Sequence, residues 1–375
     1  MKKNGLKEIA LLFLKLGTTA FGGPAAHIAM MRREVVVKKK WLSEQHFLDL
    51  IGATNLIPGP NSTEMAIQVG HERGGWKGLL IAGFCFIMPA VLITGCLAWL
   101  YKSYGQLPQA QPFIYGIKPA VIAVIIAAIY PLAKKSFQTI ELGIIGIVAL
   151  VLSLLNFSEV IILFGAGFVA MFLAAIRLKK LNSTNSFVPL FFTGTTVSGF
   201  FGALNFRLFL SFLKIGAILY GSGYVLFAFL DSELVAHGII SRRQLIDAIA
   251  VGQFTPGPVF SAVTFIGYQV NGLNGAVIST VGIFLPSFVF VALLNPLVRK
   301  MRGSKLFAAF LNAVNAASIA LIIAVCYQMG KDSIGDWRTI LIAVCSAIIL
   351  FRFKTINSVF IILGGSVAGY LLLLL

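Results

Sequence analysis

Two segments of this sequence combine helix-breaking residues with small polar side chains. Asn55-Leu-Ile-Pro-Gly-Pro-Asn-Ser-Thr63 and Gln253-Phe-Thr-Pro-Gly-Pro-Val-Phe-Ser261 each hold a Pro-Gly-Pro triplet within an apolar stretch. Because proline removes a backbone donor and clashes with the preceding turn, each triplet predicts that one helix ends and another begins. The free N–H groups where a helix restarts carry about half a positive charge, which suits an anion. The two breaks are therefore predicted to build an electropositive, polar pocket.

The candidate anion-binding residues are of three kinds: lysines within apolar stretches, hydroxyl or amide side chains beside a break, and glycines that let backbone N–H groups approach a ligand. They are Lys15, Lys214, Gly22, Gly23, Asn55, Gly59, Asn61, Ser62, Ser222, Gln253, Thr255, Gly257 and Ser261. A charge at the centre of a bilayer costs about 2.5–3.5 kcal/mol on the insertion scale, so a buried charge suggests a function. On the same argument Asp49, Glu64 and Asp247 are candidates for proton coupling.

Each of these signals also has a purely structural interpretation. A single Pro-Gly-Pro triplet is more often only a tight loop, Lys15 could extend to the membrane interface, and Asp49 and Asp247 could cap helices or form ion pairs. The recurrence of the whole arrangement at two places favours binding.

Composition places the chain in a membrane. Of its 375 residues 58% are hydrophobic and 11% charged, its mean hydropathy is +0.92, and apolar runs of about 17–25 residues, the length that a bilayer requires, recur throughout. The net charge of +17 comes from short basic clusters between apolar runs, as in membrane loops, so nucleic acid is not an expected partner. The cysteines and histidines show no metal-ligand spacing and no nucleophile–base grouping, so neither an enzyme nor a metal or other cofactor is expected.

The sequence contains an internal repeat. Phe13-Leu-Lys-Leu-Gly17 recurs as Phe212-Leu-Lys-Ile-Gly216, and Glu34, the Pro-Gly-Pro triplet and Pro89 recur in the same order at a nearly constant spacing. We therefore expect one repeat at 1–185, a linking span at 186–205 and a second repeat at 206–375.

The basic residues predict that the second repeat is inverted. Arg73 and Lys77 precede the apolar span 77–101, whereas basic residues follow its counterpart, 275–298. By the positive-inside rule the two spans run in opposite directions, and inverted repeats are typical of transporters with alternating access. The predicted fold is an all-α polytopic membrane protein with two inverted-topology repeats, helices broken at Pro-Gly-Pro and about 13 spans. Whether the broken segments cross the membrane or re-enter stays open.

The sequence resembles the chromate ion transporter (CHR) family in its long, two-repeat form. The resemblance rests on Phe21-Gly-Gly-Pro24, Trp41-Leu-Ser-Glu44, Pro58-Gly-Pro60 and the spacing of Gly70, Gly75 and Gly78, and it covers nearly the whole chain. It implies a secondary transporter of the inner cell membrane that exports chromate, with sulfate as a look-alike substrate. Ser222 and Gly223 depart from the Gly-Pro of the first repeat, which suggests that the halves contribute unequally.

Other transport modes remain open at this stage. The chain lacks a Gly-x-x-x-x-Gly-Lys-Ser/Thr motif, so an ion gradient is the expected energy source. A passive anion channel and a sulfate uptake carrier are the alternatives. The expected partners are the oxyanion and the lipid bilayer, and a homodimer is left open.

Overall fold

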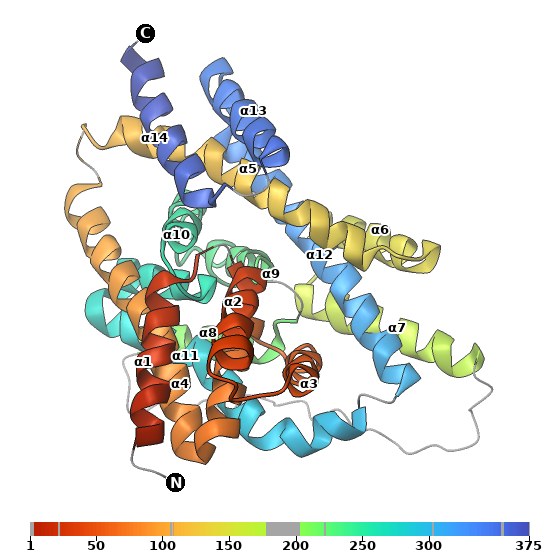
Figure 1. The fold of residues 1–375 in the computed structure, drawn as a ribbon. Coiled ribbons are helices and arrows are strands. Elements are labelled where there is room, and N and C mark those ends of the chain that lie inside the picture. The colour runs from red at the N-terminus through yellow and green to blue at the C-terminus, as the bar shows by residue number, and fades with distance from the viewer. Residues whose placement is uncertain are drawn as a thin grey trace.

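The computed structural model describes residues 4–21, 23–105, 107, 109–177, 203–220, 223–301, 304–353 and 356–374. Over these ranges the chain is helical and has no strand, so the predicted all-α class is confirmed for this part (Figure 1). The first half holds α1 (Asn4–Thr19), α2 (Gly23–Arg32), η1 (Arg33–Lys38), α3 (Glu44–Thr54), α4 (Asn61–Tyr104), α5 (Gln111–Ser136), α6 (Ile140–Leu154) and α7 (Glu159–Arg177). The second half holds α8 (Ala203–Ile218), α9 (Val225–Leu230), η2 (Asp231–Val235), α10 (Arg242–Phe254), η3 (Val259–Ser261), α11 (Ala262–Met301), α12 (Lys305–Ser333), α13 (Trp337–Arg352) and α14 (Ser358–Leu374).

Several of the helices are suited to a bilayer. Among the described residues five are long and apolar enough to cross one, namely α4, α5, α7, the segment 259–293 and α12, and the apolar helices α6 and α14 are shorter. This agrees with a polytopic membrane protein. The number of spans, their inverted orientation and the repeat boundaries stay predictions, and most of the linking span lies outside the described residues.

The longest helix of each half is bent at a glycine. Gly75 (φ 59°) interrupts α4, and Gly272 (φ 56°) interrupts α11 at the equivalent place. A positive φ is easily adopted only by glycine. The arms on either side of the bend then meet, because a Cβ added to Gly78 would lie 2.1 Å from the carbonyl oxygen of Gly70. The small residues at this spacing therefore serve close backbone packing.

The two halves exchange their terminal helices. Within each half α1 packs on α4 and α8 on α11, and α4 contacts α11 between the halves. The pair α13 and α14 packs on α5 of the first half, while α6 and α7 pack on α12 of the second (Figure 1). Gly116 of α5 makes the closest approach, because a Cβ there would lie 2.0 Å from the Gly365 carbonyl oxygen of α14. The largest hydrophobic cluster accordingly contains residues from both halves.

Candidate anion site at the first Pro-Gly-Pro break

Each Pro-Gly-Pro break is hydrogen-bonded to the opposite half. The N–H of Gly59, between α3 and α4, donates to the carbonyl of Leu219 just after α8 at 2.7 Å. The N–H of Gly257, between α10 and η3, donates to the carbonyl of Ala20 just after α1 at 2.8 Å. The sequence predicts the breaks but not this exchange, which places each of them between the two halves.

Glycine at position 59 leaves space for a carboxyl group. Gly59 has φ +134°, and a Cβ on it would lie 2.3 Å from Oε1 of Glu64 and 2.8 Å from Oγ of Ser287. Glu64 belongs to the first turn of α4, and Ser287 comes from α11 of the other half. The Glu64 carboxyl thus lies against the backbone of the break, at the start of the restarting helix.

Glu64 and Ser287 are both fully buried, with no exposed side-chain surface. Neither oxygen of Glu64 nor Oγ of Ser287 has a hydrogen-bond partner among the described residues. The Tyr220 hydroxyl group lies within electrostatic range of Glu64. Native proteins pair nearly all buried polar groups, so a cluster without internal partners is a candidate site for a bound ligand, ion or water. Thr63 Oγ1 and the Gln68 amide, on the same arm of α4, are also buried without partners.

The second break is packed differently. Ala262 stands where the first repeat has Glu64, and Thr94 Oγ1 donates to the hydroxyl of the preceding Ser261 at 3.3 Å. A Cβ on Gly257 would lie 3.0 Å from the Ala90 Cβ, whereas a Cβ on the equivalent Gly59 would lie near the Ser287 hydroxyl. The hydroxyl pair and the methyl group leave this break less polar, so only the first break contains a buried carboxyl group.

The two repeat-related lysines pair with glutamates. Lys15 Nζ lies 3.1 Å from Glu34 Oε1, and Lys214 pairs with Glu233 in the same way. Both glutamates lie in the short π-helices η1 and η2. About half of each lysine side chain is exposed (57% and 48%), in contrast to the buried Glu64. Sequence reasoning missed the glutamates as partners, although their equivalence in the repeat was a signal.

The remaining sequence-predicted residues are spread around the breaks. Asn61 donates its side-chain N–H to exposed Asn55 at 3.0 Å, and Ser62 is buried beside it. In the second half Thr255 Oγ1 donates to the Gly252 carbonyl at 3.2 Å, and Gln253 is buried with its amide nitrogen unpaired among the described groups. Gly23 begins α2 with φ +80°. Gly22 and Ser222 lie outside the described residues.

The three candidate carboxylates occupy different surroundings. Asp49 is half-buried on α3. Asp247 on α10 is nearly buried and accepts a hydrogen bond from the Tyr101 hydroxyl at 2.6 Å. Lys118 and Arg243 lie within electrostatic range of Asp247. Glu64 alone among the three is fully buried at a break.

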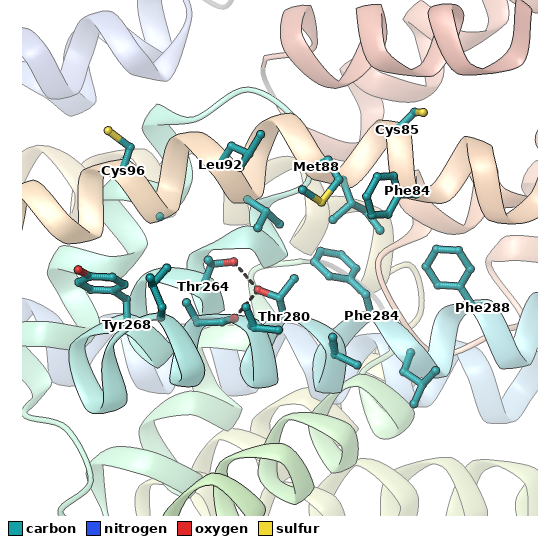
Figure 2. Close-up of a pocket in the computed structure, with 18 of the residues that line it drawn as sticks. Phe84, Cys85, Met88, Leu92, Cys96, Thr264, Tyr268, Thr280, Phe284 and Phe288 are labelled. Atoms are coloured by element: carbon teal, nitrogen blue, oxygen red, sulfur yellow. Dashed lines mark hydrogen bonds between the residues drawn. The ribbon is translucent and has the colours of Figure 1, made fainter. Parts of the chain in front are cut away.

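A large groove between α4 and α11 is a poor anion site (Figure 2). Its volume is about 1120 Å³. Its lining is mainly apolar and aromatic and includes Phe84, Met88, Leu92, Phe284 and Phe288. The hydroxyls of Thr264 and Thr280 hydrogen-bond to each other at 2.8 Å and are thereby satisfied. None of the described residues that line the groove is charged, and such a surface suits lipid acyl chains better than an oxyanion.

Apolar spanning helices around a polar, broken-helix centre define a polytopic membrane protein. A family model described as "Chromate transporter" matches residues 7–172 and 206–370, most of the chain in two parts. The chain therefore belongs to the chromate transporter family, whose members are multi-pass membrane transporters of the cell membrane and not enzymes. Its role is accordingly the transport of an anion.

Curated relatives match over nearly their whole length. The chain is 33% identical to the chromate transport protein of Cupriavidus metallidurans, over 97% of this chain and 92% of that protein. It is 31% identical to a probable chromate transport protein of Synechococcus elongatus, over 97% and 95%. It is 28% identical to the chromate transport protein of Pseudomonas aeruginosa, over 96% and 90%. No solved structure matches this chain.

Proposed function

We propose that this protein is a secondary transporter of tetrahedral oxyanions that exports chromate and also accepts sulfate. The observation that carries the proposal is the first break, where the start of α4, Glu64 and Ser287 of the other half form a buried polar cluster without internal partners. The names of the relatives support chromate as the substrate. An energy source other than nucleotide fits a chain that has no phosphate-binding Gly-Lys-Ser/Thr motif.

The chemistry of the cluster suits a tetrahedral dianion. At the start of α4 the N–H groups of Thr63 and Glu64 donate to the Pro60 carbonyl, so those of Asn61 and Ser62 are the ones without a partner within the helix. The partial positive charge of this helix end favours an anion. Ser62, Thr63 and Ser287 add hydroxyl donors that are buried beside them. Each hydrogen bond to a charged oxygen contributes about 1.5–3 kcal/mol. Chromate and sulfate have the same shape and charge, so these donors serve both.

Alternating access is the proposed mode of transport. Exchanged terminal helices and exchanged break contacts tie the two halves together, so a movement of one half displaces the break of the other. In an inverted-repeat carrier the two halves exchange conformations to open each side in turn. The predicted anion-binding residues outside the first break line the route by which the anion reaches the site at that break, and they line the opposite side of the site. They include Lys15, Lys214, Gln253, Thr255 and Ser261.

The proposal is tested by flux of radiolabelled chromate and sulfate in proteoliposomes, with and without a pH gradient. We expect saturable flux and counterflow, and we expect Ser287→Ala to raise the half-saturation concentration several-fold. Ser346→Ala on α13 is a matched control, because Ser346 is also a buried serine but lies on a terminal helix. Flux without counterflow would identify a passive channel, and inward transport of sulfate alone would identify an uptake carrier.

A further inference from the structure

We propose that the Glu64 carboxyl group is the proton carrier of this transporter and that it competes with the substrate for one seat, so that protons and oxyanions are exchanged. This inference rests on the proposed function and names the coupling ion and the residue that carries it. The structure supports it by three features: the position of the carboxyl group, the absence of a counter-charge beside it, and the inequality of the two breaks.

The first feature is position. Glu64 Oε1 lies 2.3 Å from the point where a Cβ of Gly59 would be, and Ser287 Oγ lies 2.8 Å from the same point. The carboxyl group therefore fills the space between the Pro-Gly-Pro backbone, the start of α4 and the hydroxyl from α11. An oxyanion drawn to these donors needs the same space. The carboxyl group and the substrate exclude each other sterically.

The second feature is the absence of a counter-charge. No lysine or arginine of the described chain lies within electrostatic range of Glu64, and the titratable side chain that does is the Tyr220 phenol after α8. Burying an ionised carboxylate without a partner costs far more than burying the neutral acid. Glu64 can therefore occupy the seat only as the neutral acid, with its proton on one carboxyl oxygen.

The third feature is the contrast between the breaks. The residue equivalent to Glu64 in the second repeat is Ala262, which is buried and has no polar side-chain atom, and the preceding Ser261 accepts a hydrogen bond from Thr94. The position equivalent to Ser287 is Ala90, whose methyl group meets Gly257. Had the polar residues served only to pack a Pro-Gly-Pro loop, both breaks would need them. The carboxyl group is thus specific to the first break, where it implies one proton site per chain.

These features define an exchange step. When the oxyanion enters the seat, the Glu64 side chain rotates out toward water, its O–H bond breaks, and the proton passes to a water molecule on that side. When the oxyanion leaves on the other side, the carboxylate takes a proton from water there and returns to the seat. One proton crosses in the opposite direction to each oxyanion, so a proton gradient directed inward drives export.

The first test measures binding of inorganic sulfate to the purified full-length protein in detergent. We expect each bound sulfate to release one proton, detected with a pH-sensitive dye in weak buffer, and affinity to fall by up to about tenfold per pH unit on acidification. Proton uptake on binding, or affinity that rises in acid, would overturn the exchange. Failure of the wild-type protein to bind or transport any oxyanion would instead overturn the proposed function itself.

The second test uses variants in proteoliposomes. We expect Glu64→Ala to keep sulfate counterflow and bind sulfate without proton release, but to lose the flux that a pH gradient drives. Glu64→Gln, which keeps the shape of the neutral acid, is expected to bind weakly at every pH and also to release no proton. Glu44→Gln is the control, because Glu44 is an exposed glutamate paired with Arg32. Coupled flux that survives in either Glu64 variant would refute the role of Glu64.

Discussion

At the scale of single residues, the site depends on one glycine and one carboxyl group that touch. Gly59 adopts φ +134° and lies against Glu64, and neither property is available to a larger residue. A non-glycine residue in such a conformation costs about 1–3 kcal/mol, and the added methyl group would also push the carboxyl group away from the break. The two effects are separable, because other glycines with positive φ have open surroundings.

We expect Gly59→Ala to reduce transport more than tenfold, because its methyl group would occupy the place of Glu64 Oε1. Gly238→Ala is the matched control, since Gly238 also has a positive φ (+68°) but no atom within 4 Å of an added Cβ. Flux assays and thermal unfolding in detergent are compared for both. Equal losses of transport in the two variants would attribute the effect to backbone strain alone.

The lysines of the repeat give a second residue-scale prediction. We expect Lys15→Gln and Lys214→Gln to weaken transport strongly by removing positive charge that attracts the dianion, and we expect this difference from the wild type to shrink at high salt, which screens exposed charges. Both pairs are about half exposed on the lysine side, and exposed pairs contribute only about 0–1 kcal/mol to stability, so folding should be unaffected. Normal flux at low salt in both variants would leave the lysines as partners of Glu34 and Glu233 only.

At the scale of elements, the helices of one half are anchored on those of the other. Helix α13 begins after Asp336, whose carboxylate accepts the Thr339 N–H at 2.8 Å and a hydrogen bond from the Tyr115 hydroxyl on α5. The hydrogen bond from Tyr115 and that from the backbone of Thr339 hold the pKa of Asp336 below its usual value. A single carboxylate in the connection before α13 thus caps this helix and ties it to the helix it packs on.

We expect Asp336→Ala to lower stability by about 0.5–2 kcal/mol, the usual cost of losing an N-cap, and Tyr115→Phe to lower it less. Because the pKa of Asp336 is depressed in the folded state, the wild type keeps this advantage above the unfolded pKa and loses it as the pH falls through the folded value. Thermal unfolding in detergent at neutral and acidic pH measures this difference in stability between the wild type and the variants. If the stability difference between Asp336→Ala and the wild type did not become smaller at acidic pH, the Asp336 carboxylate would not be the helix cap.

At the scale of the whole molecule, the two halves form one interleaved body. Each Pro-Gly-Pro break is hydrogen-bonded to the other half. The terminal helices α13 and α14 pack on α5, and α6 and α7 pack on α12. Neither half therefore keeps all its packing when separated. Such an arrangement suits a carrier in which both halves must move together. The predicted inverted orientation of the two halves can be tested by chemical labelling of introduced cysteines.

We expect cysteines introduced at Trp76 and Leu273 to be labelled from opposite sides of the membrane, because these positions are equivalent in the two repeats and follow the bends of α4 and α11. Both side chains are well exposed, and unlike Gly75 and Gly272 neither requires a positive φ. The four native cysteines are first replaced by serine. Labelling of both positions from the same side would reject the inverted topology.

The sequence by itself determined the all-helical membrane class, the family and the two breaks, because these follow from local properties. Hydropathy over a bilayer's thickness, the missing N–H of proline and the freedom of glycine act within a few residues of the chain, and repetition made them recognisable. Glu64 was singled out as a charged residue within an apolar stretch, but only as one of three carboxylates.

Only the tertiary structure decided which side chains meet. Ser287 is far from Glu64 in the chain and reaches it because α11 packs on α4 across the halves, and Asp247 acquires Tyr101 in the same way. Lys15 and Glu34 are 19 residues apart, and their pairing depends on how α1, α2 and η1 fold against one another. Such contacts depend on the angles and positions at which helices cross. Because the crossing is set by the packing of many side chains together, no short segment of the sequence determines it. Burial therefore separated Glu64 from half-buried Asp49, and the lack of a hydrogen-bond partner separated it from Asp247, which is also buried.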